Sequence, residues 1–492
     1  MSDKQYDVII IGAGVSGLIT GAYLSKEYRV LILERNPFIG GLCSTLKLDD
    51  ATWFNVGAHF LPDRFADEPF IEQIFDDFPE YRRYFRDLLV KIPLGIIDGK
   101  KLFWIKNEID FFDSLLRTFP KSKVELVNFN NKFNSIKSQL SKLMQGNLNC
   151  DFSILKDASV DLLEAIDSII ISSELKKLIT GPVLWPGGDL GFLIMYLDMY
   201  FQGIYGIKGG VAPFFKIFGR IIEENQGEIL LNKEVANIIS ENGIAIGCKT
   251  YDGLEFFGRR IISSISPRKL YSELLSQNEA CVKYGEQLTN IPVASSAIQV
   301  TLLIDGEINE YAGGYYVVLP ESYEELRNWY QDTERRKVNN RCVIWVFISD
   351  NNMKMCSQGK TLIQIIMPVY GDLYFNLSNQ ERNKITEAMK NELFRIIPSI
   401  KNKIIYEETW TPSNYMEIFG NDGGSALAWH LSVPITKKPR RKCRIMKNLY
   451  LIGHWIFFGG LPGVFRNSKG VAEMVKDELN IETKKDRNAN IN

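Results

Sequence analysis

The sequence predicts an α/β fold, in which a domain built on a parallel sheet is interrupted by two insertions that form an α+β domain. Two unbroken apolar runs, residues 8–11 and 30–33, have the composition of strands that are covered on both faces of a sheet. Residues 15–26 between them have a helical composition, so the three segments predict one βαβ unit. At 492 residues the chain also exceeds the size that one hydrophobic core usually serves. We therefore expect two packed domains.

The bulk composition is that of an ordinary folded protein. Apolar residues make up 45% and charged residues 24%, and the formal net charge is -1, which disfavours nucleic acid as a partner. The seven cysteines are scattered without a CxxC pair, so we expect reduced thiols and no metal site. The start MSDKQYD has no signal-peptide pattern, and no apolar run reaches the length of a membrane span. We expect a cytoplasmic protein that is still free to contact a membrane surface.

Later segments continue the first domain. Residues 208–231 predict an amphipathic helix and a strand, residues 260–265 a strand after a hairpin at Asp252, and residues 449–452 a strand before a helix that begins near Pro462. The first insertion has helical apolar spacing, whereas the second alternates in the manner of strands, so we expect a helical lid above a sheet floor. The expected boundaries are 1–92, 205–266 and 431–480 for the discontinuous first domain, 93–204 and 267–430 for the substrate and lid domain, and 481–492 for a flexible tail.

A GxGxxG motif occupies residues 12–17, directly after the first strand and at the start of the helix. Gly12 permits a tight turn, Gly14 lets the backbone approach a pyrophosphate, and Gly17 allows close packing of helix against strand. The helix N-terminus adds free N–H groups and the positive end of a dipole. Glu34, at the tip of the second strand, is placed to accept hydrogen bonds from both ribose hydroxyls. Because these features occur in register, the sequence predicts a Rossmann-like dinucleotide-binding domain.

The segment after the second strand indicates which dinucleotide is bound. Residues 34–45 have the sequence ERNPFIGGLCST, which resembles the corresponding stretch in FAD proteins of the amine oxidase and phytoene desaturase superfamily. The glycines at 40 and 41 let the backbone lie against a flavin nucleotide without a clash from Cβ atoms. Leu42 departs from the pattern, since many relatives carry a cationic residue there. The chain has no second GxGxxG, so we expect FAD without a separate, tightly held NAD(P).

Two further stretches carry the same resemblance. Residues 448–464 run from a strand through Gly453 to a Gly-Gly-Leu-Pro-Gly turn, as in the closing signature of phytoene desaturases. The helix that starts there is expected to aim its amides at the flavin pyrimidine edge, where negative charge accumulates on reduction. Residues 205–235 resemble a family block in which the residue matching Val235 contacts the adenine half. The chain is thus similar to the phytoene desaturase-like branch, that of carotenoid desaturases and isomerases, of the FAD-dependent amine oxidase superfamily, which implies a two-dinucleotide-binding domain with an inserted substrate domain.

His59 is the candidate catalytic residue. Residues 55–60 resemble the FDxGP stretch of phytoene desaturases and the GxH stretch of UDP-galactopyranose mutases, both of which pass the isoalloxazine. A histidine there can hold a substrate group or relay a proton, or it can hydrogen-bond the backbone or a flavin carbonyl, and both interpretations stay open. Asn55 replaces the usual aspartate, so no carboxylate base is expected in this loop. The predicted cofactor contacts are Gly12, Gly14, Val15, Ser16, Gly17, Glu34, Arg35, Gly40, Gly41, Leu42, Gly57, Ala58, Val235, Gly453, His454, Gly463 and Val464.

Other side chains have a structural and a functional interpretation. Arg466, one turn into the last helix, fits a solvated helix residue better than a contact of an anionic substrate. Two aromatic groups either line the pocket or belong to the core. The first lies in the helical insertion and comprises Trp185, Phe192, Tyr196, Tyr200 and Tyr205; the second precedes the Gly-Gly turn and comprises Trp455, Phe457 and Phe458.

No Ser-His-Asp, paired-carboxylate or metal-ligand pattern stands out, so the flavin itself is the expected reactive group. The resemblance implies an FAD-dependent oxidoreductase that desaturates, saturates or isomerises an apolar, polyene-like small molecule by hydride transfer to or from flavin N5, with no electron acceptor assigned. One alternative is an amine oxidase-type or natural-product tailoring oxidase, which an aromatic cage without a long tunnel would favour. Another is a mutase-like flavoenzyme without net redox, which would need arginines that clamp a diphosphate.

Overall fold

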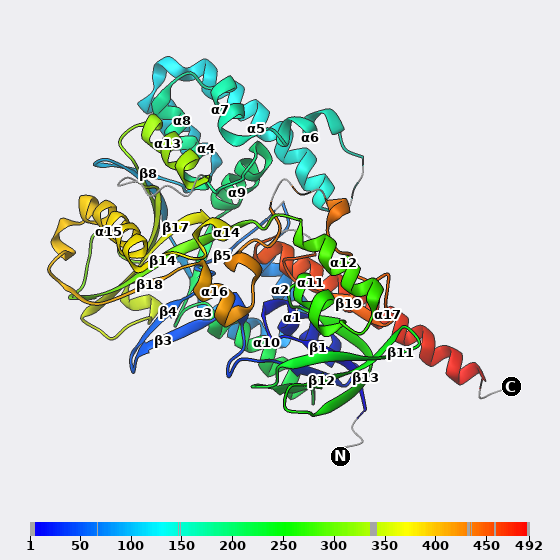
Figure 1. The fold of residues 1–492 in the computed structure, drawn as a ribbon. Helices are drawn as coiled ribbons and strands as arrows, with labels where there is room; N and C mark the ends of the chain where they lie inside the picture. Colours follow the sequence, from blue (N-terminus) through cyan, green and yellow to red (C-terminus); the bar gives the residue numbers. More distant parts are fainter. Residues whose placement is uncertain are drawn as a thin grey trace.

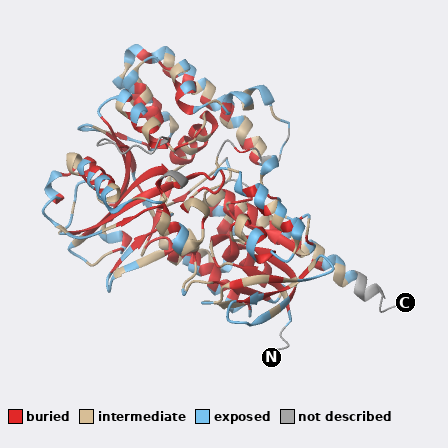
Figure 2. Cartoon of the chain, viewed as in Figure 1, coloured by how far each residue is buried: buried red, intermediate tan, exposed pale blue. Residues whose placement is uncertain are grey.

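Two bodies packed against each other make up the molecule in the computed structural model (Figure 1). One contains both ends of the chain and a mainly parallel sheet, and the other contains a second sheet with a layer of helices beyond it. Buried residues follow the strands of both sheets, whereas exposed residues gather on the outer helices (Figure 2). The structure describes residues 5–65, 67–145, 147, 149–334, 342–430, 433, 435–456 and 459–489.

The first sheet contains the predicted βαβ unit. Its strand order is β10 (Glu228–Leu230), β2 (Val30–Leu33), β1 (Gln5–Ile11), β13 (Glu255–Ser263), β12 (Ile244–Thr250) and β11 (Val235–Glu241), with β19 (Leu449–Leu451) paired to β13. The pairs β10–β2, β2–β1, β1–β13 and β13–β19 are parallel, and β12 and β11 extend the sheet as an antiparallel hairpin. β2 is apolar and buried throughout, and β1 is apolar and buried from Val8 to Ile11, as expected for strands covered on two faces.

Helices cover both faces of this sheet. α1 (Val15–Ser25) packs against α10 (Ala212–Glu224) and α17 (Leu461–Ala489) on one face, and α12 (Glu279–Thr289) shares a core with the other face. Helix α17 includes residues 481–489, which the sequence prediction assigned to a flexible tail. Glu482 of α17 forms ion pairs with Arg259 and Arg260 of β13, and these contacts hold the helix to the sheet at that residue.

The second sheet combines strands from both insertions. Its order is β18 (Ile404–Trp410), β14 (Ser295–Asp305), β17 (Lys360–Tyr370), β16 (Ile344–Ile348), β15 (Gly314–Leu319), β7 (Leu94–Asp98) and β8 (Lys101–Trp104). Neighbours are antiparallel except for the parallel pair β7–β15. The sequence predicted strands in the second insertion, but it did not predict β7 and β8 in the first. β7 pairs with β15 and β8 with β7, so the two insertions form one unit.

The lid lies beyond the second sheet and shares one hydrophobic core with it, to which Phe112 and Ile166 of the lid and Val317 and Trp345 of the sheet contribute. The lid helices are α4 (Glu108–Thr118), α5 (Lys123–Met144), α6 (Phe152–Ala158), α7 (Leu162–Ile169), α8 (Ser173–Thr180) and α9 (Leu190–Gln202). Further described elements are β3 (Thr45–Asp49), β4 (Thr52–Asn55), β5 (Leu61–Pro62), β6 (Leu89–Ile92), β9 (Ile204–Ile207), α2 (Phe70–Asp77), α3 (Arg82–Leu88), α11 (Pro267–Lys269), α13 (Tyr323–Glu334), α14 (Gly371–Tyr374), α15 (Asn379–Ile396) and α16 (Pro412–Phe419).

The predicted fold class is confirmed, because a Rossmann-like sheet carries an inserted unit of helices and strands. The residue boundaries assigned to the domains stay a prediction. Within the described part of the chain, every helix is too short or too polar to cross a lipid bilayer.

Candidate functional site

A cavity of about 330 Å³ lies at the carboxyl ends of β1 and β2, the edge of an open α/β sheet where ligands bind. Its wall includes Ile11 and Leu33 at those strand ends, Gln299 of β14 and Tyr196 of α9, so both bodies contribute. The predicted cofactor residues that line it are Gly12, Gly14, Val15, Ser16, Glu34, Arg35, Gly40, Gly41, Leu42, Gly57, Ala58, Val235, Gly453, His454 and Val464. Their contact with a cofactor stays a prediction.

The glycines of the N-terminal turn have different surroundings. A Cβ atom on Gly14 would meet no atom within 4 Å, whereas one on Gly17 would lie 2.0 Å from the carbonyl oxygen of Gly12. Gly14 therefore leaves open space in the cavity wall, and Gly17, which does not line the cavity, permits close packing of α1. Gly14 is also the N-cap of α1 and places no side chain on the first amides of the helix, which suits an anionic ligand.

The Gly-Gly pair lies directly against this turn. The Gly40 N–H donates to the Ala13 carbonyl at 2.8 Å, and both Gly40 and Gly41 have positive φ, 117° and 57°. A Cβ atom on Gly41 would approach the Gly14 Cα to 3.2 Å. Two glycine turns thus form one continuous backbone surface, on which a phosphate chain fits without side-chain obstruction.

Glu34 is held by the backbone at the tip of β2. Its Oε2 accepts from the Ala13 N–H at 2.7 Å and its Oε1 from the Asn36 N–H at 2.9 Å. Burial raises the pKa of Glu34, although these hydrogen bonds oppose the shift. A carboxylate oxygen has more than one lone pair, so both oxygens keep acceptor capacity toward the cavity. This arrangement suits the two hydroxyls of a ribose.

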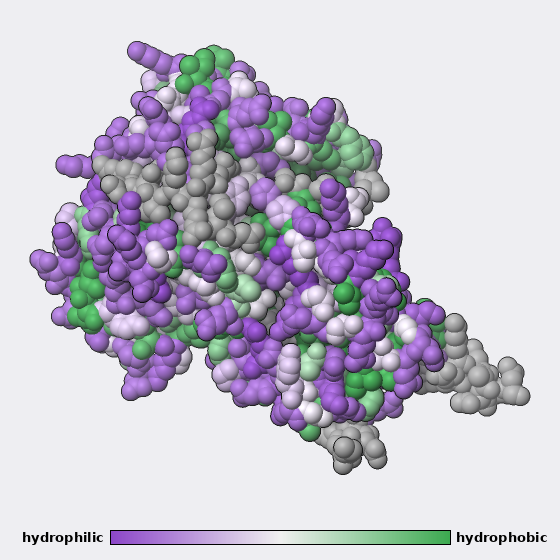
Figure 3. Space-filling model, viewed as in Figure 1, coloured by the Kyte–Doolittle hydropathy of each residue, from purple (hydrophilic) through white to green (hydrophobic). Residues whose placement is uncertain are grey.

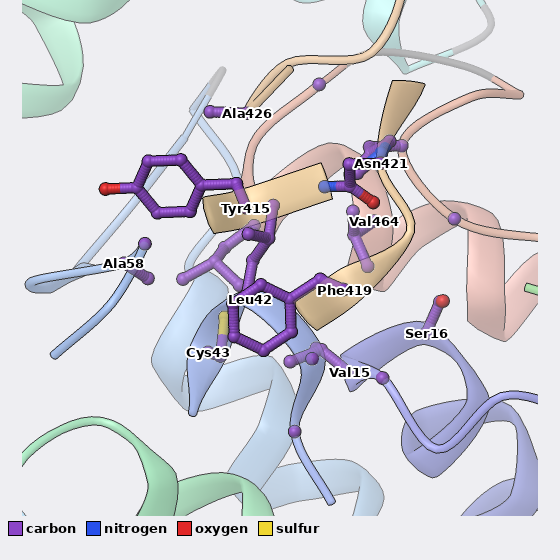
Figure 4. Close-up of a pocket in the computed structure, with 18 of the residues that line it drawn as sticks. Val15, Ser16, Leu42, Cys43, Ala58, Tyr415, Phe419, Asn421, Ala426 and Val464 are labelled. Carbon is purple, nitrogen blue, oxygen red and sulfur yellow. The ribbon is translucent and has the colours of Figure 1, made fainter. Parts of the chain in front are cut away.

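Arg35 lines the cavity, and its side chain binds backbone carbonyls at the end of α16. Its Nη2 donates to the carbonyls of Glu417 and Ile418 at 3.1 and 2.8 Å, and so it holds the end of α16. Phe419 follows, and Figure 4 shows its ring between Leu42 and Val15. The sequence prediction missed Phe419, because nothing near it in sequence marks it as a neighbour of the glycine turn.

The start of α17, which packs beside α1, lines the same cavity. Gly460, Leu461, Pro462 and Val464 contribute to the wall, whereas Gly463 does not. His454, after the end of β19, also lines it, and its Nε2 has no hydrogen-bond partner among the described residues. Burial lowers the pKa of His454 to about 4, so the ring is neutral near pH 7. The two helix N-termini of α1 and α17 therefore face one shared space.

His59 lies in the cavity wall and is 7% exposed. Burial lowers its pKa to about 4, while the side chains of Gln299 and Gln364 act in the opposite direction. Its Nδ1 has no hydrogen-bond partner within the described part of the chain. The same two glutamines donate to the Asn55 carbonyl at 2.8 and 2.7 Å and so fix the start of the loop that carries His59.

The Asn55 side chain has a structural role. Its Oδ1 accepts from the Val211 N–H at 2.9 Å and from the Thr45 hydroxyl at 3.2 Å. The Thr45 Oγ1 in turn accepts from the Ala212 N–H at 3.0 Å. Asn55 and Thr45 together satisfy the first amides of α10, which explains a polar residue here without catalysis.

The aromatic candidates divide between cavity and core. Trp185, Tyr196 and Tyr200 line the cavity, together with Phe60 and Tyr315. Phe192 and Tyr205 are not in its wall, Trp455 packs in the core with its ring 4.8 Å from that of Trp429, and Phe457 and Phe458 fall outside the described residues. Arg466 forms an ion pair with Glu68 at 2.9 Å and is likewise absent from the wall.

Charge divides the cavity into two ends. Glu34, Arg35, Lys233, Glu234 and Lys269 account for the charged side chains among its described lining residues. They form one group, because the Lys233 N–H donates to the Glu34 carbonyl at 2.8 Å and Lys269 pairs with Glu234 at 2.9 Å. We call this the Glu34 end, and the part lined by His59 and the aromatic rings the His59 end. No group of three or more metal-ligating side chains occurs among the described residues.

Comparison with known proteins agrees with this geometry. Residues 10–78 match the model of the NAD(P)-binding Rossmann-like domain. The chain is 22% identical to 4,4'-diapophytoene desaturase (4,4'-diapolycopene-forming) of Methylomonas sp, over 97% of this chain and 96% of that one. It is 23% identical to prolycopene isomerase 1 of an Oncidium hybrid cultivar, over 98% and 85% of the two chains. The chain is a homologue of carotenoid desaturases and isomerases. The resemblance predicted from its motifs is thereby confirmed.

Solved structures share the fold of this chain. An oxidoreductase from Methanosarcina mazei aligns with a TM-score of 0.62 at 17% identity, covering 95% of this chain and all 100% of the other. Putrescine oxidase bound to putrescine aligns with a TM-score of 0.64 at 12% identity, covering 97% and 99%. Rat all-trans-retinol 13,14-reductase is 20% identical in sequence, over 94% of this chain and 85% of the enzyme.

Besides Phe419, the wall residues that sequence reasoning missed include Gln299 and Tyr315, and it also missed Gln364, which lies outside the wall but holds the loop of His59. Gln299 and Gln364 lie in the interiors of the buried strands β14 and β17, and each is at most 1% exposed. A glutamine in a fully buried strand needs a polar partner, and this was the signal that could have drawn attention to them. Tyr315 gave no such signal, because tyrosine is an ordinary strand residue.

Proposed function

We propose that the chain is an FAD-dependent oxidoreductase that acts on an apolar, polyene-like small molecule. The observation that carries the proposal is the division of one cavity into a glycine-lined end with a buried carboxylate and an uncharged, aromatic end. A dinucleotide suits the first end, and a largely apolar substrate suits the second. The three homologues named above, a desaturase, an isomerase and a reductase, support redox chemistry on such a molecule.

The residues at the Glu34 end fit FAD. Open space at Gly14, uncapped amides at the start of α1 and the acceptor oxygens of Glu34 match a pyrophosphate and a ribose. The amides at the start of α17 would then face the flavin ring. When bound, FAD supplies a hydride acceptor or donor.

The residues at the His59 end would position the substrate and exclude water. His59 is neutral at pH 7 because burial lowers its pKa to about 4, so it offers a hydrogen bond without a charge. The loop that carries it is fixed through the Asn55 carbonyl by Gln299 and Gln364. We assign His59 to contact with the substrate or the flavin edge, in keeping with its position in the wall.

Desaturation, saturation and isomerisation all remain within this proposal, and the two alternatives receive less support. The amine oxidase alternative is supported by a shared fold at 12% sequence identity, and a shared fold does not specify the substrate. A mutase of sugar diphosphates needs cations near the reacting group, but the described cations of the wall gather at the Glu34 end.

The experiment is reconstitution with FAD followed by anaerobic reduction with polyenes, amines and NADPH. Bleaching of the flavin absorbance by a polyene, or turnover of a polyene by the reduced protein, is the expected result. If amines alone bleach the flavin, the alternative replaces the proposal. Protein that stays colourless after reconstitution would overturn both.

Contact with a membrane surface is the second part of the proposal. Ile171 and Val124 at the outer end of the lid are 83% and 72% exposed, and they are neighbours because the Ile171 N–H donates to Glu125 at 2.7 Å. Lys121 and Lys123 flank them, a pattern suited to anionic headgroups. Figure 3 shows some hydrophobic surface among hydrophilic residues at the end of the molecule where the lid helices lie. Flotation with anionic vesicles tests this, and binding that survives the double variant Val124→Ser/Ile171→Ser would contradict it.

A further inference from the structure

The uncharged end of the cavity contains polar atoms that a pure hydrocarbon would leave without partners. His59 is 7% exposed, and its Nδ1 has no hydrogen-bond partner among the described residues. The Nε1 of Trp185 is buried and equally unpartnered in that part of the chain. Both side chains line the cavity. Buried polar atoms in folded proteins nearly always find a partner. The Trp185 N–H, which only donates, and the His59 Nδ1, which in a neutral ring either donates or accepts, therefore call for an explanation.

Further hydrogen-bonding groups surround the same space. The hydroxyl-bearing rings of Tyr196 and Tyr315 line the cavity. Phe60, next to His59 in the chain, packs against Tyr315 with ring centroids 5.2 Å apart. Burial raises the pKa of Tyr196 to about 12, so its hydroxyl keeps its proton at neutral pH. The His59 end is therefore apolar in its walls but not free of hydrogen-bonding atoms.

The partner that these atoms require is neutral and accepts hydrogen bonds. An indole N–H only donates, so the group opposite Trp185 must be an acceptor. A carboxylate or phosphate would need a nearby cation, but the described cations of the wall lie at the Glu34 end. A protonated amine offers no acceptor and would lack a carboxylate there. A hydroxyl or carbonyl oxygen meets all of these conditions.

We propose that the substrate is a polyene-like molecule that carries a neutral hydroxyl or carbonyl oxygen, bound by Trp185 and His59 at the uncharged end of the cavity. The inference rests on the proposed function and narrows its substrate class. It distinguishes this cavity from one that accepts an unsubstituted hydrocarbon chain. Trp185 then sets which end of the substrate enters, because the oxygen is held at a fixed place in the wall.

The first experiment uses the FAD-loaded protein and a matched series of polyenes of equal length. The series contains the hydrocarbon, its terminal alcohol, its aldehyde and its carboxylate, and binding is measured by thermal stabilisation and by quenching of tryptophan fluorescence. The alcohol or the aldehyde should bind at least about tenfold more tightly than the hydrocarbon, since a site built for an oxygen discriminates against its absence. Comparison of the alcohol with the aldehyde distinguishes recognition of a hydroxyl from recognition of a carbonyl.

The outcomes separate the inference from the proposed function. A hydrocarbon that binds as tightly as its alcohol, or a carboxylate that binds best, overturns the inference while polyene chemistry stands. If no member of the series binds or bleaches the flavin, the proposed function fails instead. These measurements need no variant, so they remain decisive if a substitution prevents folding.

The second experiment locates the oxygen. Trp185→Phe removes the N–H and keeps an aromatic ring, and it should lower the affinity for the preferred oxygenated polyene about tenfold while leaving that for the hydrocarbon unchanged. Tyr316→Phe is the matched control, because Tyr316 is 2% exposed but packs on Trp104 and Tyr311 away from the cavity. An unchanged ratio of the two affinities in Trp185→Phe would overturn the assignment.

Discussion

The Glu34 end and the His59 end of the cavity are constructed in different ways. At the Glu34 end the wall is mostly backbone, and its main turns lie within residues 12–42. At the His59 end the wall is made of side chains, such as His59, Trp185 and Tyr315, from segments more than a hundred residues apart in the chain. A backbone-built site needs glycine at fixed positions and changes little with the substrate. A side-chain-built site can be altered one residue at a time, so cofactor class and substrate class are set by separate parts of one cavity.

The largest expected effect tests whether the glycines of the turn at residues 12–17 are interchangeable. In Gly17→Ala the new Cβ would lie 2.0 Å from the Gly12 carbonyl oxygen, a backbone atom that cannot rotate away. We expect the free energy of unfolding to fall by about 3 kcal/mol or more, as in overpacked cores. Urea denaturation measures this. Wild-type stability would show that Gly17 has no packing role.

Gly14→Val should have the opposite effect: it should leave the fold intact and weaken the binding of FAD. Its Cβ would enter open space, and Gly14 has extended backbone angles that valine accepts, so the fold should be retained. The side chain would occupy the surface proposed for the pyrophosphate, and we expect FAD affinity to fall at least about 100-fold. Flavin content after reconstitution and titration of the cofactor-free protein measure the loss. A fully yellow Gly14→Val protein would remove the cofactor from this end.

The His59 end can be tested by pH. The folded pKa of His59, about 4, is lower than its ordinary value of 6.5, so the unfolded chain binds the proton more readily. This contribution to stability is complete above pH 6.5 and is lost as the pH falls toward 4. By pH 5 the loss amounts to about 2 kcal/mol.

The His59→Gln variant keeps a polar side chain that does not titrate. The difference between its free energy of unfolding and that of the wild type, measured against pH, therefore isolates the contribution of His59. His454, whose pKa burial also lowers to about 4, titrates in both proteins and cancels. Parallel curves between pH 6.5 and 5 would mean that His59 is protonated or paired in the folded state.

These differences also explain what the sequence could predict. β1, α1, β2 and the two glycine turns follow from local patterns, since a turn between an apolar strand and a helix needs glycine wherever it occurs. The strands β7 and β8 do not, because they are five and four residues long within a helical insertion. β7 pairs with β15, which lies more than two hundred residues later, and β8 in turn pairs with β7.

The His59 end shows the same limit more strongly. His59 itself was identified through a family motif, but its fixing partners Gln299 and Gln364 lie on two strands that only the folded sheet brings together. The spacing of Trp185, Phe192 and Tyr196 left open whether each ring lines the cavity or belongs to the core. The expectation that all three are largely buried could not distinguish the two wall residues from Phe192. Orientation decides such cases, and it is set by packing between elements.

The smallest effect is expected outside both ends. Arg466 lies in the first turns of α17, close enough in sequence to the cavity wall to suggest a role in binding an anion. Its guanidinium instead pairs with Glu68 at 2.9 Å, and both side chains are about one third exposed, at 30% and 36%. Exposed ion pairs contribute less than about 1 kcal/mol, so Arg466→Ala should change unfolding free energy by no more than that and leave FAD affinity unaltered. Glu68→Ala should behave alike, and the double variant should equal either single one, because the two residues act through one shared contact. A large loss of flavin in Arg466→Ala but not in Glu68→Ala would place a cation in the wall after all and blur the division between the two ends.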